Sequence, residues 1–225
     1  MILVSIVITN YNYGRFIGRA IRSCLNQSLD QKHIEIIIVD DNSKDNSREI
    51  IKSFGDKIKS IFLEENKGVA YCSNIGIRKS MGVYVMRVDA DDYINEKMVE
   101  VLLMFLHQNP QKAFAYCDHI RVSEVEAREE RVSLKTEKEL LEHGAGILFK
   151  KSCLEIIGLY DEEMRNCEDM LLLKKLLLHH YEGIYIELPL YRYLRHGANM
   201  TDNKKDREEW KHKVDEKIEG SGLTF

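Results

Sequence analysis

The chain has 225 residues, a length that suits one domain with a well-buried core, and no linker rich in proline, glycine or serine divides it. Its 37 acidic and 33 basic side chains give a formal net charge of −4 and are mixed in sign, so no basic stripe indicates binding to nucleic acid. No apolar run approaches the length of a transmembrane segment and the N-terminus lacks a basic signal region, so we expect a cytoplasmic protein.

Strand-like apolar runs alternate with helical patterns through the first half of the chain. The runs lie at residues 2–8, 34–39, 58–63 and 83–88. Helical spacing of apolar residues is clear in the segments that begin at Ile17 and Met98. This order predicts right-handed β-α-β units and the α/β class, with a mostly parallel central sheet flanked by helices.

The second half is less regular. A strand-like run at 113–118 precedes a charged stretch from Glu124 to Glu142, which has few apolar anchors and which we expect to order over a bound substrate. The pattern then predicts, in order, a strand from Gly144 to Phe149, a helix that ends at Gly158, a helix at about 167–180 and a strand at 184–194.

Residues 201–225 form a tail dominated by charge. Trp210, Val214 and Ile218 are spaced four residues apart and form a narrow apolar seam, which predicts a helix. The charges of this segment are nearly balanced, which gives anionic lipid little attraction. We therefore favour docking on the domain or contact with a second subunit in a homodimer over binding at a membrane surface.

Acidic residues follow two of the predicted strands. Asp89, Asp91 and Asp92 come directly after the run at 83–88, and Asp40 and Asp41 come directly after the run at 34–39. Carboxylates this close raise one another's pKa unless a cation lies between them, and a hard divalent cation with oxygen ligands is the usual solution. Ligands of open α/β sheets bind beyond the carboxyl ends of the strands, so both clusters are expected at one pocket. The alternative is turn and helix-cap chemistry.

Common nucleotide and calcium motifs are absent. The first strand-like run leads into Thr9-Asn-Tyr-Asn-Tyr-Gly14 and not into Gly-x-Gly-x-x-Gly, and no Gly-x4-Gly-Lys-Ser/Thr segment occurs. The segment Asp89–Glu100 is not an EF-hand, because Tyr93 and Ile94 stand where an oxygen ligand and the turn glycine are required.

Several segments together resemble the inverting GT-A glycosyltransferases of family 2, with matching order and spacing over about residues 3–200. In the first half these are Val4–Asn12, Ile36–Asp45, Asn66–Gly68 with Asn74–Gly76, and Val88–Asp92. In the second half they are Gly146–Lys151, Ile157–Asp161 and Cys167–Asp169. The resemblance implies a GT-A (Rossmann-like) domain over 1–200, with a donor half at about 1–118, a smaller acceptor half at about 119–200 and the tail 201–225 outside it.

The resemblance also implies a metal-dependent, inverting transfer of one sugar from a nucleoside diphosphate sugar, with a UDP-sugar favoured, to a hydroxyl of a glycan or lipid-linked glycan. Such an acceptor implies a cytoplasmic location at the inner face of the membrane. The implied roles are Thr9, Tyr11 and Asp41 around the base, Asp89 by the ribose, Asp91 as ligand of Mn²⁺ or Mg²⁺, Asp92 in its place if the register is one residue later, His196 as a further metal ligand, and Asp169 as general base.

Other interpretations remain open at this point. Asp169 also suits a helix start, and His196 also suits an exposed loop. Ser73 stands where many relatives have arginine, which weakens the assignment of the donor. The absence of transmembrane helices after the catalytic part favours single-sugar transfer over processive synthesis. A nucleotidyltransferase acting on sugar phosphates and a non-catalytic nucleotide-sugar binding module are the alternative functions.

Overall fold

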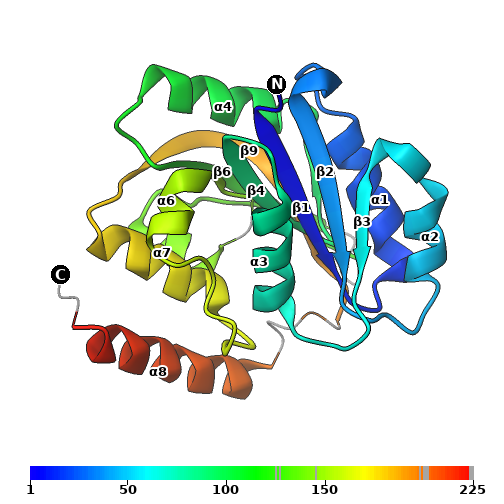
Figure 1. The fold of residues 1–225 in the computed structure, drawn as a ribbon. Coiled ribbons are helices and arrows are strands. Elements are labelled where there is room, and N and C mark those ends of the chain that lie inside the picture. The colour runs from blue at the N-terminus through cyan, green and yellow to red at the C-terminus, as the bar shows by residue number, and fades with distance from the viewer. Residues whose placement is uncertain (125, 127, 145, 198, 200–202, 223–225) are drawn as a thin grey trace.

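The computed structural model of the protein describes residues 1–124, 126, 128–144, 146–197, 199 and 203–222. Strands and helices alternate through the first half and are less regular in the second (Figure 1). The strands are β1 (Val4–Asn10), β2 (Ile34–Asp40), β3 (Lys59–Phe62), β4 (Tyr84–Asp89), β5 (Tyr93–Ile94), β6 (Phe114–Ser123), β7 (Arg128–Val132), β8 (Leu148–Lys150) and β9 (Gly183–Arg195). The helices are α1 (Gly14–Leu25), α2 (Ser47–Ser53), α3 (Val69–Lys79), α4 (Met98–Gln108), α5 (Glu137–Glu142), α6 (Lys151–Ile156), α7 (Glu168–Leu178) and α8 (Lys204–Gly220).

The described strands form one curled sheet in the order β3-β2-β1-β4-β8-β6-β9-β5, with β7 paired to β6. Strands β3, β2, β1 and β4 are parallel because a helix connects each to the next. Strand β8 is antiparallel to β4 and β6, β9 is parallel to β6, and β5 is antiparallel to β9. The predicted α/β sheet is confirmed, with its parallel part in the first half and mixed pairing in the second.

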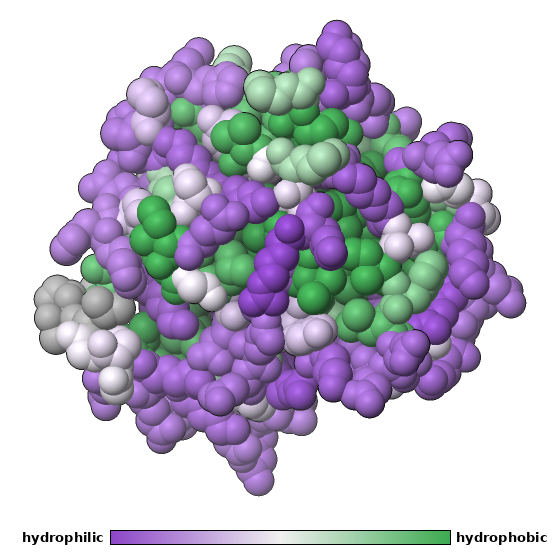
Figure 2. Space-filling model, in the orientation of Figure 1, coloured by the Kyte–Doolittle hydropathy of each residue, from purple (hydrophilic) through white to green (hydrophobic). Residues whose placement is uncertain are grey.

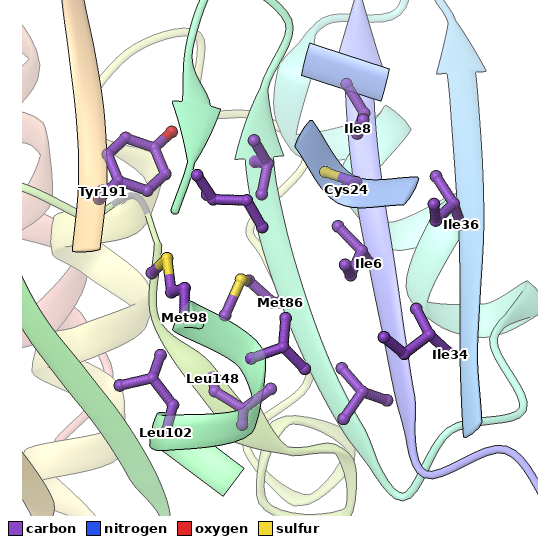
Figure 3. Close-up of a cluster of buried hydrophobic side chains, with 14 of the residues drawn as sticks. Ile6, Ile8, Cys24, Ile34, Ile36, Met86, Met98, Leu102, Leu148 and Tyr191 are labelled. Carbon is purple, nitrogen blue, oxygen red and sulfur yellow. The ribbon is translucent and has the colours of Figure 1, made fainter. Parts of the chain in front are cut away.

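Helices cover both faces of the sheet. Alternate residues of β1 point to opposite sides, so Ile6 and Ile8 join the core beneath α1 and α4, and Val7 joins the core beneath α3, α6 and α7. Figure 3 shows the first of these cores, where Met86 of β4 packs near Met98 and Leu102 of α4. Burial on both faces explains why the strand sequences are almost continuously apolar.

Helix α8 docks along α7, at the bottom of the view in Figure 1. Val214 is fully buried and Ile218 nearly so, against a small apolar cluster that includes Met170 and Leu171 of α7. Ion pairs flank this contact, including Lys174–Asp215 at 2.6 Å and Lys217–Asp161 at 2.9 Å. The rest of α8 is polar, and Figure 2 shows hydrophilic residues over this lower part of the molecule while hydrophobic residues gather nearer the middle of the face.

The charged stretch that follows β6 contains two regular elements. Strand β7 pairs with β6 from His119–Val132 to Ser123–Arg128, and α5 begins with a capping box between Thr136 and Glu139. Residues 125 and 127 of this stretch, and 201–202 and 223–225 of the tail, lie outside the described residues. Among the described helices, none combines the length and the apolar character that a membrane crossing requires.

Candidate active site

A cavity of about 940 Å³ opens at the carboxyl ends of β1 and β4 and extends past β6 and β9 to α8. The sequence-predicted residues that line it are Thr9, Tyr11, Asp41, Asp89, Asp91 and Asp169. Asp92 and His196 are not part of the described lining. The parallel register explains the gathering at one edge, because Thr9 of β1 pairs with Val39 of β2 on one side and with Asp89 of β4 on the other.

The part of the cavity wall beside β2 is held together by Asp41. Its carboxylate accepts hydrogen bonds from the backbone N–H groups of Lys67 at 2.7 Å and Gly68 at 2.8 Å, which anchors the loop before α3. Gly68 has a φ of 90°, and a Cβ there would lie 2.2 Å from a guanidinium nitrogen of Arg165. Tyr11 is exposed at the same wall, with its ring open to a ligand.

Asp40 has a structural role beside this wall. It is fully buried, accepts hydrogen bonds from Arg48 Nε at 2.7 Å and Asn10 Nδ2 at 2.8 Å, and does not line the cavity among the described residues. Asp40 therefore stabilises the turn after β2, where it also accepts a hydrogen bond from the Ser43 N–H group. Its neighbour Asp41 borders the cavity.

The acids after β4 point to different surroundings. Asp91 borders the cavity, and its Oδ2 lies 3.0 Å from His196 Nε2. Asp92 is 1% exposed and accepts hydrogen bonds from the Tyr191 hydroxyl at 2.7 Å and the Leu194 N–H at 2.8 Å. Burial and the nearby charges of Asp91 and Asp89 raise the pKa of Asp92 well above its usual value. Asp92 thus joins this turn to β9 beneath the cavity.

His196 is oriented by aromatic rings and is not an exposed loop residue. Its side chain is 4% exposed, and its ring centroid lies 4.7 Å from that of Phe16 and 5.8 Å from that of Tyr13. The interpretation of His196 as an exposed histidine is wrong, because α1 supplies a packing partner that is far away in sequence. The imidazole and the Asp91 carboxylate instead form a fixed pair.

Asp91 and His196 together have the chemistry of a partial site for a divalent cation. The described residues contain no cluster of three or more histidine, cysteine or acidic side chains arranged around a common point. Magnesium is usually held by one or two carboxylates together with substrate phosphates, and imidazole is also a ligand of first-row metals. The pair therefore fits a cation that a substrate helps to coordinate.

A buried arginine joins the two halves of the cavity. Arg87, in β4, is 7% exposed and lies 3.2 Å from Asp89 through Nε and 2.8 Å from Glu168 through Nη1, and its Nη2 also donates to Asp169. Burial alone would lower the pKa of Arg87, but Asp169 and Asp89 raise it well above its usual value. A charge buried this deeply requires such partners, since removing one leaves another unpaired.

Asp169 lies in the first turn of α7 and lines the cavity. The N-cap of α7 is Cys167, in the left-handed region with a φ of 57° and without a side-chain capping bond, so Asp169 does not act as the N-cap. Its Oδ2 accepts from Arg87, and its Oδ1 is buried; the Tyr160 hydroxyl lies close enough to lower the pKa of the carboxyl group. Burial, opposed by Arg87 and assisted by Glu168 and Asp89, raises the pKa of Asp169 to about 7. This carboxyl group is suited to accept a proton near neutral pH.

Gly144 leaves the space that Asp169 occupies. A Cβ on Gly144 would lie 1.9 Å from the Cβ of Asp169, far closer than carbon atoms approach without a bond. Neither Gly144 nor Arg87 stands out as a site residue in the sequence, although an arginine inside the apolar run of β4 is an unusual feature that indicates a buried partner.

Two histidines of the cavity wall were also missed by sequence reasoning. The rings of His119 and His143 lie 4.1 Å apart between centroids, and Tyr193 packs edge-on against both. Nothing local marks this pair, because β6 and the segment after α5 meet only in the folded chain.

Comparison with known proteins agrees with this geometry. Residues 5–157 match the family model described as glycosyl transferase family 2. An uncharacterized glycosyltransferase of Rickettsia typhi is 32% identical over 181 residues, 74% of this chain and 56% of its own length. The minor teichoic acid biosynthesis protein GgaB of Bacillus subtilis is 26% identical over 222 residues, 92% of this chain and 25% of its own length. The matched part thus spans about half or less of these relatives.

Solved structures share the fold. S. aureus TarS 1-349 in complex with UDP-GlcNAc superposes with a TM-score of 0.80 at 19% identity, over 95% of this chain and 65% of that one. The mannosyltransferase PcManGT of Pyrobaculum calidifontis, in complex with GDP-Man and Mn²⁺, gives a TM-score of 0.74 at 16% identity, over 92% of this chain and 61% of that one. These likenesses establish the GT-A architecture. Together with the family match over more than half of its length, they show that the chain belongs to glycosyltransferase family 2.

Proposed function

We propose that the protein transfers one sugar from a nucleoside diphosphate sugar to a hydroxyl of a glycan or lipid-linked glycan, with inversion at the anomeric carbon. The observation that carries this proposal is the Asp169 carboxyl group, which lines the cavity, accepts a hydrogen bond from Arg87 and has a pKa raised to about 7, mainly by burial. Neighbours that bind UDP-GlcNAc or GDP-Man support a nucleotide-sugar donor, of which a UDP-sugar is favoured. GgaB supports a cell-surface polymer as the product.

The donor lies over the first half in this proposal. Tyr11 stacks on the base, and Thr9 and Asp41 border it, since each Asp41 oxygen keeps a second lone pair for a base N–H group. Asp89 accepts from the ribose. Asp91, with His196, holds a Mn²⁺ or Mg²⁺ ion, whose charge when bound neutralises the leaving diphosphate. The structure neighbour with Mn²⁺ supports the use of a divalent cation.

The acceptor enters from the side of α7. Asp169 takes the proton of the attacking hydroxyl as that oxygen approaches the anomeric carbon from the face opposite the diphosphate. A single displacement of this kind inverts the anomeric configuration. Arg87 keeps the carboxylate oriented through its hydrogen bond to Oδ2. With its apolar seam buried against α7, α8 supports docking within one subunit over a homodimer through the tail.

The test compares two neighbouring carboxyl groups of the Arg87 cluster. We expect Asp169→Asn to lower kcat for transfer by roughly 10² to 10⁴-fold, the contribution of a general base, and to leave donor affinity nearly unchanged. Glu168→Gln is the matched control, because it also removes a charge beside Arg87 but leaves the proposed base. An equal loss in both variants would indicate that Arg87 pairing matters, and would contradict the assignment of the base.

A panel of nucleoside diphosphate sugars, with and without Mn²⁺, decides the alternatives. Release of nucleoside diphosphate that requires the cation supports the glycosyltransferase. Tight binding without hydrolysis or transfer to any acceptor would instead indicate a binding module.

A further inference from the structure

The cavity continues beyond the catalytic residues to a wall formed by β6, β9 and α8. In the parallel register of β6 and β9, His119 pairs with Tyr191, Arg121 with Tyr193 and Ser123 with Arg195. Because every second residue of a strand points to the same side, these residues share one face of the sheet. The side chains of that face that line the cavity are His119, Arg121, Tyr191, Tyr193 and Arg195, and Arg207 of α8 completes the wall.

The polar groups of this wall include one that the protein leaves unused. His119 is 3% exposed, and its Nε2 has no hydrogen-bond partner among the described residues. A buried polar atom without a partner costs roughly 1 to 3 kcal/mol, so such an atom at a cavity indicates a ligand. His143 packs against it, and both rings contact Tyr193.

Positive charge surrounds the two imidazoles. Burial first, then His143 and Arg121, lower the pKa of His119 to about 3, opposed by Asp118. Burial, Arg121 and Arg207 lower the pKa of His143 to about 4, opposed by Glu142. Both rings are therefore neutral at pH 7 in the absence of an added negative charge.

Most carboxylates near this wall are already engaged, whereas Glu208 of α8, which also lines the cavity, is exposed and has only a 3.4 Å contact with Lys211. Asp118 accepts from Arg131 at 2.5 Å and from the Tyr185 hydroxyl at 2.6 Å, so it is turned away from the histidines. Glu142 accepts from Arg207 at 2.6 Å and from Lys211 at 2.9 Å. The contact of Arg121 with Glu130 is longer, at 3.4 Å, and both side chains are well exposed. Arg121 is thus held only loosely by its carboxylate partner.

Positive residues extend past this wall. A second cavity of about 430 Å³ shares Arg121 and Arg195 with the first and adds Arg128 of β7, together with Glu126 and Glu130. Arg128 is paired with Glu126 at 2.7 Å, so the guanidinium groups shared by the two cavities are those of Arg121 and Arg195. Guanidinium groups bind phosphate oxygens in a bidentate manner. The guanidinium groups of Arg121 and Arg207, together with a histidine ring N–H group, have more hydrogen-bond donors than a single carboxylate can accept.

We propose that the wall formed by His119, Arg121, His143 and Arg207 binds a phosphate group of the acceptor. This proposal rests on the proposed function and names the class of acceptor: a glycan that carries phosphate close to the hydroxyl to be glycosylated. The phosphate belongs either to a phosphodiester within the acceptor chain or to the diphosphate of a lipid carrier. Its negative charge raises the pKa of both imidazoles, and a neutral imidazole can donate its ring N–H group to a phosphate oxygen.

The experiment uses the full chain with its donor site filled by UDP and Mg²⁺. Titration calorimetry measures the affinity for inorganic phosphate, for a bis-glycerol phosphodiester and for farnesyl diphosphate, and NMR follows the C2 protons of His119 and His143. We expect phosphate to bind, to shift both histidine signals, and to bind at least ~10-fold more weakly to Arg121→Gln and Arg207→Gln. Arg22→Gln, an exposed arginine of α1, is the matched control and should bind as the wild type does.

The outcomes separate the sources and the proposals. Tighter binding of the diester assigns the phosphate to the acceptor chain, and tighter binding of farnesyl diphosphate assigns it to a lipid carrier. Because Arg207 also holds Glu142, thermal unfolding checks that variant, and Arg121→Gln carries the test if α8 loosens. Phosphate affinity that is unaltered in Arg121→Gln, or histidine signals that do not move, would overturn the proposal. Asp169→Asn should lower transfer by roughly 10² to 10⁴-fold but leave phosphate binding intact, so either proposal can fail alone.

Discussion

The contact between Gly144 and Asp169 leads to a quantitative prediction. A Cβ on Gly144 would lie 1.9 Å from the Cβ of Asp169, about 1.5 Å short of ordinary van der Waals contact, which begins near 3.4 Å. In Gly144→Ala the first turn of α7 must therefore move by about this amount. Displacing a reacting group by about 1 Å costs on the order of 10²-fold in rate, so we expect kcat to fall by ~10²-fold. Donor affinity should stay within about twofold of the wild type, because the proposed role of Asp169 is toward the acceptor.

Steady-state kinetics with saturating donor measures the effect, and calorimetry with nucleoside diphosphate measures the donor affinity. Gly220→Ala is the matched control, because a Cβ there meets no atom within 4 Å. Thermal unfolding of both variants separates a shift of Asp169 from a general loss of structure. A Gly144→Ala protein with wild-type kcat would refute the reasoning, since the segment around residue 144 would then have moved in place of the base.

Three further predictions concern charge, metal and packing. The pKa of Asp169 is raised to about 7, and the base acts only when it is ionised. We therefore expect kcat to fall about tenfold per pH unit below pH 7 and to reach a plateau above it. A kcat that does not change between about pH 5 and 8 would contradict this. EDTA or Asp91→Ala should remove most of the calorimetric heat of nucleoside diphosphate binding, while Asp56→Ala, on the surface, should not; full binding in EDTA would exclude the metal role. Val214→Ala removes two buried methyl groups and should lower the free energy of unfolding, measured by urea denaturation, by ~1.6 kcal/mol. The exposed control Glu216→Ala should lower it by less than ~0.5 kcal/mol. Equal values for the two variants would show that α8 is not docked in solution.

The first half of the fold was predictable from the sequence, because its strands and helices are marked by patterns of neighbouring residues. The apolar runs of β1, β2 and β4 and the helices between them determine a parallel sheet, and the acids at the strand ends then border one cavity. Strand β7 was not predicted, because its sequence from Arg128 to Val132 is charged and largely exposed. Its place in the sheet depends on pairing with β6.

The sequence was sufficient to predict which residues belong to the site, but not which partners each of them contacts. Neighbouring acids look alike in sequence, yet the turn after β4 directs Asp91 to the cavity and buries Asp92 against β9. Arg87 meets Glu168 and Asp169 across 81 and 82 positions, a separation over which no periodicity operates. The His119–His143 pair likewise arises only when β6 and the end of α5 come together.

The docking of α8 has an evolutionary consequence. The helix supplies Arg207 and Glu208 to the cavity wall but contributes no strand to the sheet and lies after the segment that matches the family model. Its attachment uses one small apolar cluster and a few ion pairs, which tolerate sequence change better than a sheet does. In the proposed function, exchange of this helix would change the acceptor side of the cavity while the residues proposed to bind the donor stay the same.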